Sequence, residues 1–470
     1  MDEHDEELER FDQLLARSSL GTPGARRLRR RTPPSQVAAA RRIAHLATAA
    51  PAARDLLQVV ARLAPDHPFP LSLLCKASDL LPGLAEAACA TSNALRETCE
   101  ALHSRGLLEL DGTCVSVRAD IAGHVVGQVT PDQSVHWTKA VLRFLTHALR
   151  PDTHHRDSWA EWKLVYPHVL AVCEEAERHQ IQLGDVGYLL DRASVYLREG
   201  VKDPDGATAL AERAVTFAST ADDRELIGDS LGNLALAHWA ANRLADAIHA
   251  STASLSQVAE TYGTDHETYA ESLTIHGNIL AAAGRTAEAG LVHEQAVEIL
   301  RTLHTARPTG QIRGLLVAAL NDLAAQLLST GGPAAAGVEL LAEANELVRR
   351  GEYGWAQVTM NLARACRAVG DAIGARDHLE SVRDHCVKTR QEQSITLICA
   401  LADLAEVYKE LGDSRAGPTL REAHRVDSAS ALDAASDRPP SIEATTAKPF
   451  MANPAKAYIS PARPIVGIES

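Results

Sequence analysis

A phrase of small and apolar residues recurs through the second half of this 470-residue chain at intervals typical of stacked helix pairs. One copy reads Asn233-Leu234-Ala235, then His238 and Asn242, and continues on a second helix with Asp246-Ala247. A small alanine of the second helix marks each copy, at Ala207, Ala247, Ala289, Ala336, Ala375 and Ala416. Successive markers lie 39 to 47 residues apart. This period predicts about six units of two helices each over residues 183–425.

Each position of the phrase has a role in packing two helices together. The small alanine lets neighbouring helices approach closely, and the leucine before it fills the space between them. A glycine after the first helix, as at Gly284 and Gly370, permits the left-handed conformation that ends a helix. Thr264 and Glu267 have the spacing of a capping box, which predicts the start of a new helix there.

This phrase resembles the tetratricopeptide repeat. The period of roughly 42 residues, with Gly263, Asp265 and His266 between two copies, is similar to the longer variant found in kinesin light chains. The resemblance implies an α-α superhelix whose first helices line an extended concave groove for a peptide or protein. Two features depart from the pattern: His238 stands where Tyr is usual, and the copy that ends at Ala336 is 47 residues long.

Composition favours an all-α fold without a cofactor. Hydrophobic residues make up 46% of the chain but aromatic residues only 4%, so most of the apolar content is Ala, Leu and Val. Few bulky side chains are therefore available to line a cofactor pocket. The eight cysteines include no C-x-x-C pair, which argues against a disulfide or zinc framework. We expect no cofactor and no metal.

The sequence carries no signal for export or membrane insertion. The first ten residues, MDEHDEELER, contain no apolar segment, and no uncharged stretch of 18 or more apolar residues follows. We therefore expect a cytoplasmic location and no membrane partner.

The region before the repeats has a different pattern. Residues 53–105 read as helices, and they are followed by Leu107-Leu108-Glu109-Leu110, then Asp111-Gly112, then Thr113 to Val117. An Asp-Gly pair between two alternating runs predicts a β-hairpin. Helices followed by a hairpin predict a small winged-helix-like domain over residues 35–135. A helical linker with Trp159 and Trp162 is expected over residues 136–182, and disordered tails over 1–34 and 426–470.

The order of a winged helix and then repeats resembles the arm of bacterial signalling ATPases of the NB-ARC or STAND type. The resemblance spans roughly residues 38–425 and includes Leu63-Ala64-Pro65-Asp66 and the phrase Pro167-His168-Val169. The phosphate-binding motif G-x-x-x-x-G-K-[ST] of such ATPases is absent from this sequence, which contains no Gly-Lys pair. We therefore expect an interaction arm that works with a nucleotide-binding partner in trans.

Two motifs suggest catalysis but stand in the wrong context. Gly228 to Gly232 fits G-x-S-x-G with Ser230 as nucleophile, yet a polar segment precedes it instead of a buried strand. The two His-Glu pairs lack the second histidine of H-E-x-x-H, because the fifth positions are Ala270 and Val297. We expect no catalytic residue and no enzymatic activity.

One set of side chains on the first helices is expected to face the concave groove. Asn amides both donate to and accept from a peptide backbone, and Arg364 with Arg367, three residues apart, can clamp a carboxylate. The alternative for any one of these positions is an ordinary solvated residue. The predicted partner-binding residues are Asn233, Leu236, Trp239, Asn278, Asp322, Asn361, Arg364, Arg367, Asp403 and Lys409.

These features are compatible with two functions. The first is a non-enzymatic scaffold in regulation or signalling that binds a protein or peptide in the groove. The second is a DNA-binding transcriptional regulator that uses the winged helix for DNA and the repeats as a sensor. Arg96 and Arg105 would serve DNA contact, but Glu97 and Glu100 lie beside them, and residues 51–136 carry a net charge of -4. Because DNA attracts cationic surfaces, this charge favours the scaffold.

Overall fold

The computed structural model describes residues 42–46, 50–149, 153, 156–352, 354–389 and 395–435, and these form two compact units. The first unit ends at Ala193, and the second consists of Asp152–Arg156 and the chain from Ser194 onward. The tail predicted over residues 1–34 lies outside the described residues, as does residue 436 onward of the C-terminal tail. The exact domain boundaries stay a prediction.

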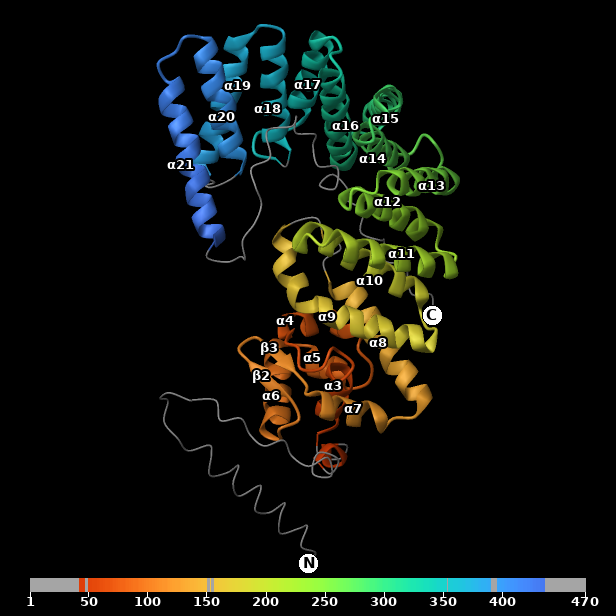
Figure 1. The fold of residues 1–470 in the computed structure, drawn as a ribbon. Helices are drawn as coiled ribbons and strands as arrows, with labels where there is room; N and C mark the ends of the chain where they lie inside the picture. The colour runs from red at the N-terminus through yellow and green to blue at the C-terminus, as the bar shows by residue number, and fades with distance from the viewer. Residues whose placement is uncertain are drawn as a thin grey trace, which may run out of the picture. The chain divides into compact units, whose positions relative to one another are not determined.

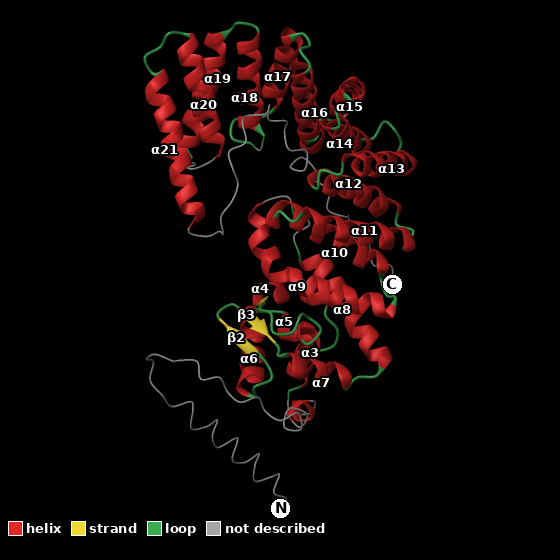
Figure 2. Ribbon diagram, in the orientation of Figure 1, coloured by secondary structure: helices red, strands yellow, loops and turns green. Residues whose placement is uncertain are grey.

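The first unit combines short helices, a small sheet and two long helices (Figures 1 and 2). Thr91 begins one of the short helices, since its side chain accepts a hydrogen bond from the backbone N–H of Ala94. The elements are α3 (Pro51–Val60), β1 (Phe69–Pro70), α4 (Leu71–Lys76), η1 (Ser78–Leu80), α5 (Ala85–Cys89), α6 (Ser92–Ser104), β2 (Glu109–Asp111), β3 (Cys114–Ser116), α7 (Ala119–Gly127), α8 (Pro131–Ala148) and α9 (Arg156–His179).

The sheet has three antiparallel strands in the order β1-β3-β2. Leu110 of β2 and Phe69 of β1 both pair with Val115 of the central strand. The turn between β2 and β3 contains Gly112 at φ +60, a conformation that glycine adopts without strain. The hairpin predicted at Asp111-Gly112 is therefore confirmed, whereas membership of the winged-helix class stays a prediction.

His168 fixes α9 to the strand-bearing part of the first unit. Its Nδ1 accepts a hydrogen bond of 3.0 Å from the backbone N–H of Ala64, and its Nε2 lies 3.2 Å from the carbonyl oxygen of Pro68. The ring also meets Phe69 edge-on at 5.0 Å. Burial lowers the pKa of His168 to about 4, so the imidazole is neutral at pH 7. The region predicted as a linker thus packs within the first unit.

The second unit is a stack of helix pairs, and each helix packs on the next one from α11 to α21. Figures 1 and 2 show these helices following one another without a strand between them. The helices are α10 (Leu183–Tyr196), which spans the unit boundary, a π-helical turn η2 (Leu197–Val201), α11 (Pro204–Thr220), α12 (Arg224–Ala240), α13 (Leu244–Tyr262), α14 (Glu267–Ala282), α15 (Thr286–Ala306), α16 (Gly310–Ser329), α17 (Ala334–Leu347), α18 (Trp355–Ala368), α19 (Ala372–Lys388), α20 (Ile395–Glu410) and α21 (Ala416–Ala435).

The second helix of each pair buries residues at positions i, i+4 and i+7, which lie on one face of an α-helix. In α15 these are Ala289, His293 and Ala296. The same triplet begins at Ala207, Ala247, Ala289, Gly337 and Ala375, and α21 follows it with buried Thr419 and Ala423 and a partly buried Val426. The marker alanines Ala336 and Ala416 were therefore assigned in the wrong register, by one and three residues. Each lies within one helical turn of a better-buried small residue of the same helix.

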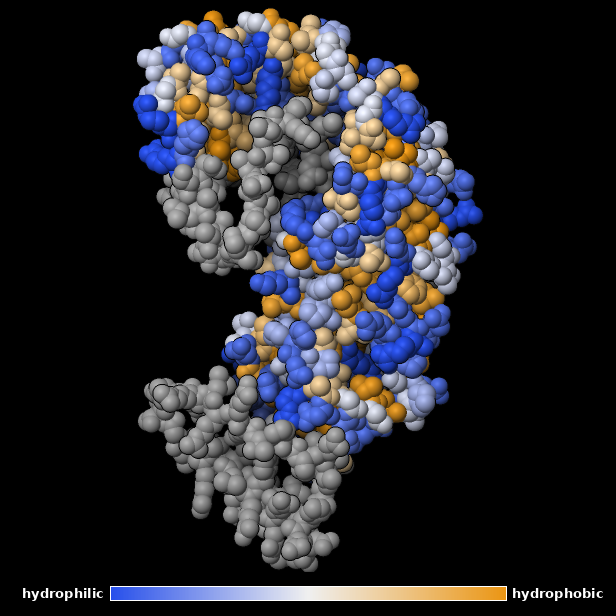
Figure 3. Space-filling view, in the orientation of Figure 1, coloured by the Kyte–Doolittle hydropathy of each residue, from blue (hydrophilic) through white to orange (hydrophobic). Residues whose placement is uncertain are grey.

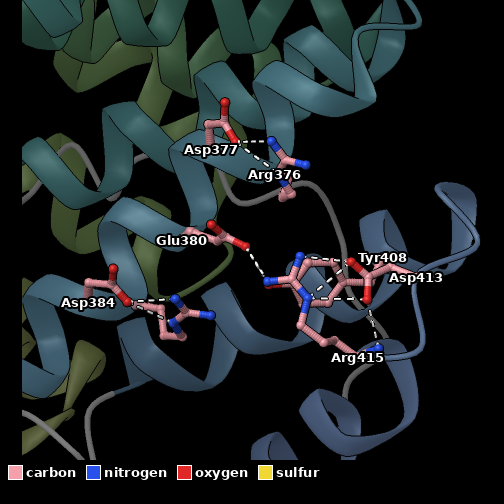
Figure 4. A network of polar contacts seen from close by, with 8 residues as sticks. Arg376, Asp377, Glu380, Asp384, Tyr408, Asp413 and Arg415 are labelled. Atoms are coloured by element: carbon pink, nitrogen blue, oxygen red, sulfur yellow. Dashed lines mark hydrogen bonds and ion pairs between the residues drawn. The ribbon is translucent and has the colours of Figure 1, made fainter.

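The C-terminal pair is closed by a network around Arg415, the residue before α21 (Figure 4). Its guanidinium lies 4.2 Å above the Tyr408 ring of α20 and 2.9 Å from a Glu380 carboxylate oxygen of α19. Tyr408 donates a hydrogen bond of 2.6 Å to the same carboxylate. The network therefore ties three consecutive helices together. Helix α21 continues to Ala435, past the predicted start of the C-terminal tail at residue 426.

Within the described residues, α16 is the one helix long and apolar enough to cross a membrane by length and composition. Its apolar window is 61% buried inside the protein. Leu316, Leu320 and Leu323 of this helix belong to the core that runs from α14 to α21. These side chains thus pack against the neighbouring helices. Over the face seen in Figure 3, hydrophilic and hydrophobic residues are interspersed on the repeats.

Candidate partner-binding groove

The first helices of successive pairs lie next to one another along one side of the second unit. Contacts join α12 to α14, α14 to α16, α16 to α18, and α18 to α20. In a curved stack the concave side is the one on which alternate helices come closest together. The first helices therefore form the inner face, where the sequence places the groove.

Polar side chains on the inner face are hydrogen-bonded into a chain that crosses three helices. Asn278 of α14 donates a bond of 2.6 Å to Asp322 of α16, and Asn321 donates to the other oxygen of Asp322 at 3.2 Å. Asn361 of α18 then donates a bond of 2.8 Å to Asn321. All four side chains are buried. We call Asn278, Asp322, Asn321 and Asn361 the inner ladder.

Partly exposed ion pairs lie next to Asn361, the last residue of the inner ladder. Arg364 donates to Asn361 at 3.2 Å and forms an ion pair of 2.8 Å with Asp403 of α20. The side chains of Arg364 and Asp403 are 35% and 27% exposed. One turn further along α18, Arg367 donates to Glu410 at 2.6 Å. We call Arg364, Arg367, Asp403 and Glu410 the charged end of the groove.

The predicted groove residues fall into a buried set and an accessible set. Leu236 was expected to line the groove, but it lies in a core cluster with Ala235 and Ile275, so it does not face a partner. Asn233 is also fully buried, and its carbonyl oxygen accepts a bond of 3.2 Å from Arg198. Of the ten residues, the accessible ones are Trp239, Arg364, Arg367, Asp403 and Lys409.

Residues 226–302 match the family described as tetratricopeptide repeat. The chain contains tetratricopeptide repeats. The match covers the pairs α12/α13 and α14/α15, where the recurring phrase of the sequence is clearest. No curated protein matches the chain.

The solved structures that are similar to this chain include the following three. A putative kinesin light chain with nearly identical TPR-like repeats from Podosopora anserina is 21% identical, with 43% of this chain and 95% of that one covered and a TM-score of 0.38. A STAND protein with a tetratricopeptide repeat sensor from Pyrococcus horikoshii is 12% identical, with 82% and 64% covered and a TM-score of 0.42. The apo form of the quorum sensor NprR from B. thuringiensis is 14% identical, with 74% and 86% covered and a TM-score of 0.47.

The G-x-S-x-G motif of Gly228 to Gly232 lies inside these tetratricopeptide repeats. Ser230 is fully buried in the middle of α12, and its hydroxyl has no hydrogen-bond partner among the described residues. A nucleophile elbow instead places the serine on an exposed turn between a strand and a helix. In the described part of the chain, no group of three or more His, Cys, Asp or Glu side chains is placed to hold a metal ion.

Two polar residues of the inner face were not predicted. Asn321 joins the two halves of the inner ladder, and Glu271 of α14 is buried with one carboxylate oxygen unpartnered. Burial, followed by the charges of Asp229 and Glu267, raises the pKa of Glu271 well above its ordinary value. The sequence does contain a signal for Asn321, because the polar pair Asn321-Asp322 stands directly before Leu323 of the recurring phrase.

Replacement of Asp322 by Asn is expected to remove a pH dependence from the stability of the repeats. Burial raises the pKa of Asp322 to about 6, although Asn278 and Asn321 oppose the shift. The folded protein therefore keeps this proton to a higher pH than the unfolded chain does. Stability that is present at acidic pH is lost as the pH rises from about 4 through about 6, by about 3 kcal/mol in total.

Urea unfolding of the wild type and Asp322→Asn at several pH values measures this loss as a difference. Both proteins contain His168 and His293, so the subtraction removes the contribution of these histidines. Their lowered pKa values make the free energy of unfolding change with pH in the opposite direction. If the difference in unfolding free energy between the two proteins is the same from about pH 4 to about pH 7, Asp322 does not have a raised pKa in the folded protein.

Proposed function

We propose that this chain is a non-enzymatic scaffold in intracellular regulation or signalling that binds a peptide or protein on the inner face of its repeats. The observation that carries the proposal is the charged end of the groove. There, Arg364 and Arg367 lie three residues apart on one helix and remain partly exposed. The inner ladder holds α18 in register beneath them.

The charged end is suited to exchange its own ion pairs for those of a partner. Exposed ion pairs contribute little net stability, because water screens them in both states. A carboxylate of the partner can therefore replace Asp403 or Glu410 at small cost and gain a fork-shaped pair of hydrogen bonds from an arginine. Asp403 and Glu410, once released, are free to accept from donors of the same partner. We propose a peptide that carries an acidic residue next to amide donors.

We propose that the small domain of the first unit is a winged-helix-like docking module, and that a nucleotide-binding protein acts with the chain in trans. The order of α3, β1, α4, α6, β2 and β3 supports this class. Its charge does not support DNA contact. Arg96 is exposed on α6 and is followed by the exposed Glu97 and Glu100, and Arg105 bends back to donate to the Ala101 carbonyl at 2.8 Å.

A pull-down from the native cell extract tests the scaffold proposal with the double variant Arg364→Ala/Arg367→Ala. The captured partner, once identified and purified, is expected to bind this variant about tenfold to a hundredfold more weakly, because two charge-assisted contacts are lost. The matched control is Arg376→Ala/Arg383→Ala, which removes two arginines from the second helix α19. Equal loss in both variants, or no loss in either, would contradict the proposed surface.

A further inference from the structure

Glu271 of α14 is a buried acid on the inner face without a counter-charge. It lies two helical turns before Asn278 of the inner ladder, so both side chains are on the same face of the helix. The residue is 7% exposed, and its Oε1 is closed to solvent with no hydrogen-bond partner among the described residues. Any contact with a further group is therefore made through Oε2. No Lys or Arg in the described part of the chain pairs with this carboxylate.

The charge around Glu271 is negative. Burial is the main cause that raises the pKa of Glu271, and the charges of Asp229 of α12 and Glu267 of α14 add to it. Helix α14 contains no Lys or Arg. Arg307, directly after α15, is engaged in an ion pair with Glu267. The charged form of Glu271 therefore needs a cation that the described helices do not supply.

The sequence contains a cationic and apolar segment beyond the described residues. Residues 448–468 include Lys448, Lys456 and Arg463 but no Asp or Glu. Apolar residues such as Tyr458 and Ile459 stand between these cations. Four prolines in the same segment disfavour a helix. An extended peptide of this kind is suited to a groove between helices. We call residues 448–468 the tail segment.

The connection to α21 is long enough for the tail segment to reach α14. The last described residue is Ala435 of α21, and residues 436–447 span at most about 40 Å when extended. Contacts join α20 to α18, α18 to α16, and α16 to α14. At about 10 Å for each step between packed helices, α14 lies about 30 Å from α20. Chain length therefore permits contact with Glu271 in the same molecule.

We propose that the tail segment docks on the inner face at α12 and α14 and places one of its cations at Oε2 of Glu271. Its three cations complement the charges of Asp229, Glu267 and Glu271, and its lack of acids avoids repulsion. An ammonium or guanidinium replaces the proton that the buried carboxyl otherwise takes up. Attachment to the same chain raises the effective concentration of the segment, so weak contacts suffice.

This docking needs no partner, so its test is independent of the scaffold proposal. A docked tail segment would cover part of the inner face, on which the partner is proposed to bind. Release of the segment would then be required before a partner could use α12 and α14.

Photo-cross-linking of the full chain, with p-benzoylphenylalanine in place of Tyr458, tests the docking. We expect cross-links to peptides of α12 and α14 within a protein that stays monomeric. Lys448→Glu/Lys456→Glu/Arg463→Glu should lower the cross-link yield about tenfold, because charge-assisted contacts are lost. The matched control Arg26→Glu/Arg27→Glu/Arg29→Glu reverses three charges in another part of the chain and should cross-link like the wild type.

A variant of the inner face completes the test. Glu271→Gln keeps the shape of the side chain and removes its charge, so the yield should fall about fivefold while circular dichroism stays unchanged. Glu298→Gln removes an exposed charge from α15 and should have no effect. Cross-links to other elements, or a yield that neither Glu271→Gln nor the reversal of the tail charges lowers, would overturn the proposal. Cross-links between two copies of the chain would overturn docking within one molecule.

Discussion

Gly277→Leu is expected to destabilise the repeats by about 3 kcal/mol, as overpacking of a filled core does. A Cβ at Gly277 of α14 would stand 2.7 to 2.9 Å from three atoms of the His293 ring. That ring is itself 1% exposed on α15, so it has no free space into which to move. Urea unfolding followed by circular dichroism at pH 7 measures the change as a lower midpoint.

A glycine on the partner helix of the same pair provides the control. Gly290 of α15 has open space where its Cβ would stand, so Gly290→Ala should stabilise the repeats by about 0.5 to 1 kcal/mol through helix propensity. The combination Gly277→Leu with His293→Ala should recover much of the loss, because the new side chain fills the space of the old ring. If both glycine variants shift the midpoint alike, the contact between Gly277 and His293 is not a packing constraint.

Asn278→Ala is expected to destabilise the repeats by about 3 kcal/mol at pH 7, because it removes a donor from a buried carboxylate. Asp322 Oδ2 would be left without its 2.6 Å hydrogen bond inside the core. The loss should shrink below about pH 6, where Asp322 takes up a proton and no longer needs a donor for a charge. Urea midpoints of the variant at pH 5 and 7 test both the size and the pH dependence.

Replacing both partners separates the hydrogen bond from the space it occupies. Asn278→Leu/Asp322→Leu removes the donor and the charge together, so no buried charge is left unpaired, although the Asn321 amide loses the acceptor that Asp322 gave it at 3.2 Å. We therefore expect the double variant to be more stable than Asn278→Ala. A double variant as unstable as the single one would mean that the unpaired charge of Asp322 is not the main cause of the instability of Asn278→Ala.

The fold of the second unit was predictable because its signal is repeated. A small residue recurs at one position of each copy, and a glycine, or Asn242 in one copy, follows the first helix. A wrong assignment in one copy therefore leaves the assignment of the others unchanged. The buried small residue of the second helix was wrongly predicted where several small residues stand next to one another. Ala334, Ala335 and Ala336 precede Gly337, and only packing against Leu328 selects the glycine as the buried position. That selection depends on the partner helix, which the spacing alone does not reveal.

The groove was harder to predict because polarity does not tell a buried amide from an exposed one. Asn278 and Asn361 were expected to face a partner, but they bond to Asp322 and Asn321 of the helix between them. Such pairing joins residues 40 and 44 positions apart. Arg364 and Asp403 were identified singly, and the structure brings them into one ion pair.

Hydrogen–deuterium exchange of the full chain, free and saturated with its captured partner, tests the central claim most directly. If the inner face binds the partner, amide exchange should slow in α18 and α20, around Arg364 and Asp403. The second helices α17 and α19 should change little. Protection confined to the second helices, or to the first unit, would contradict the inner face as the binding surface.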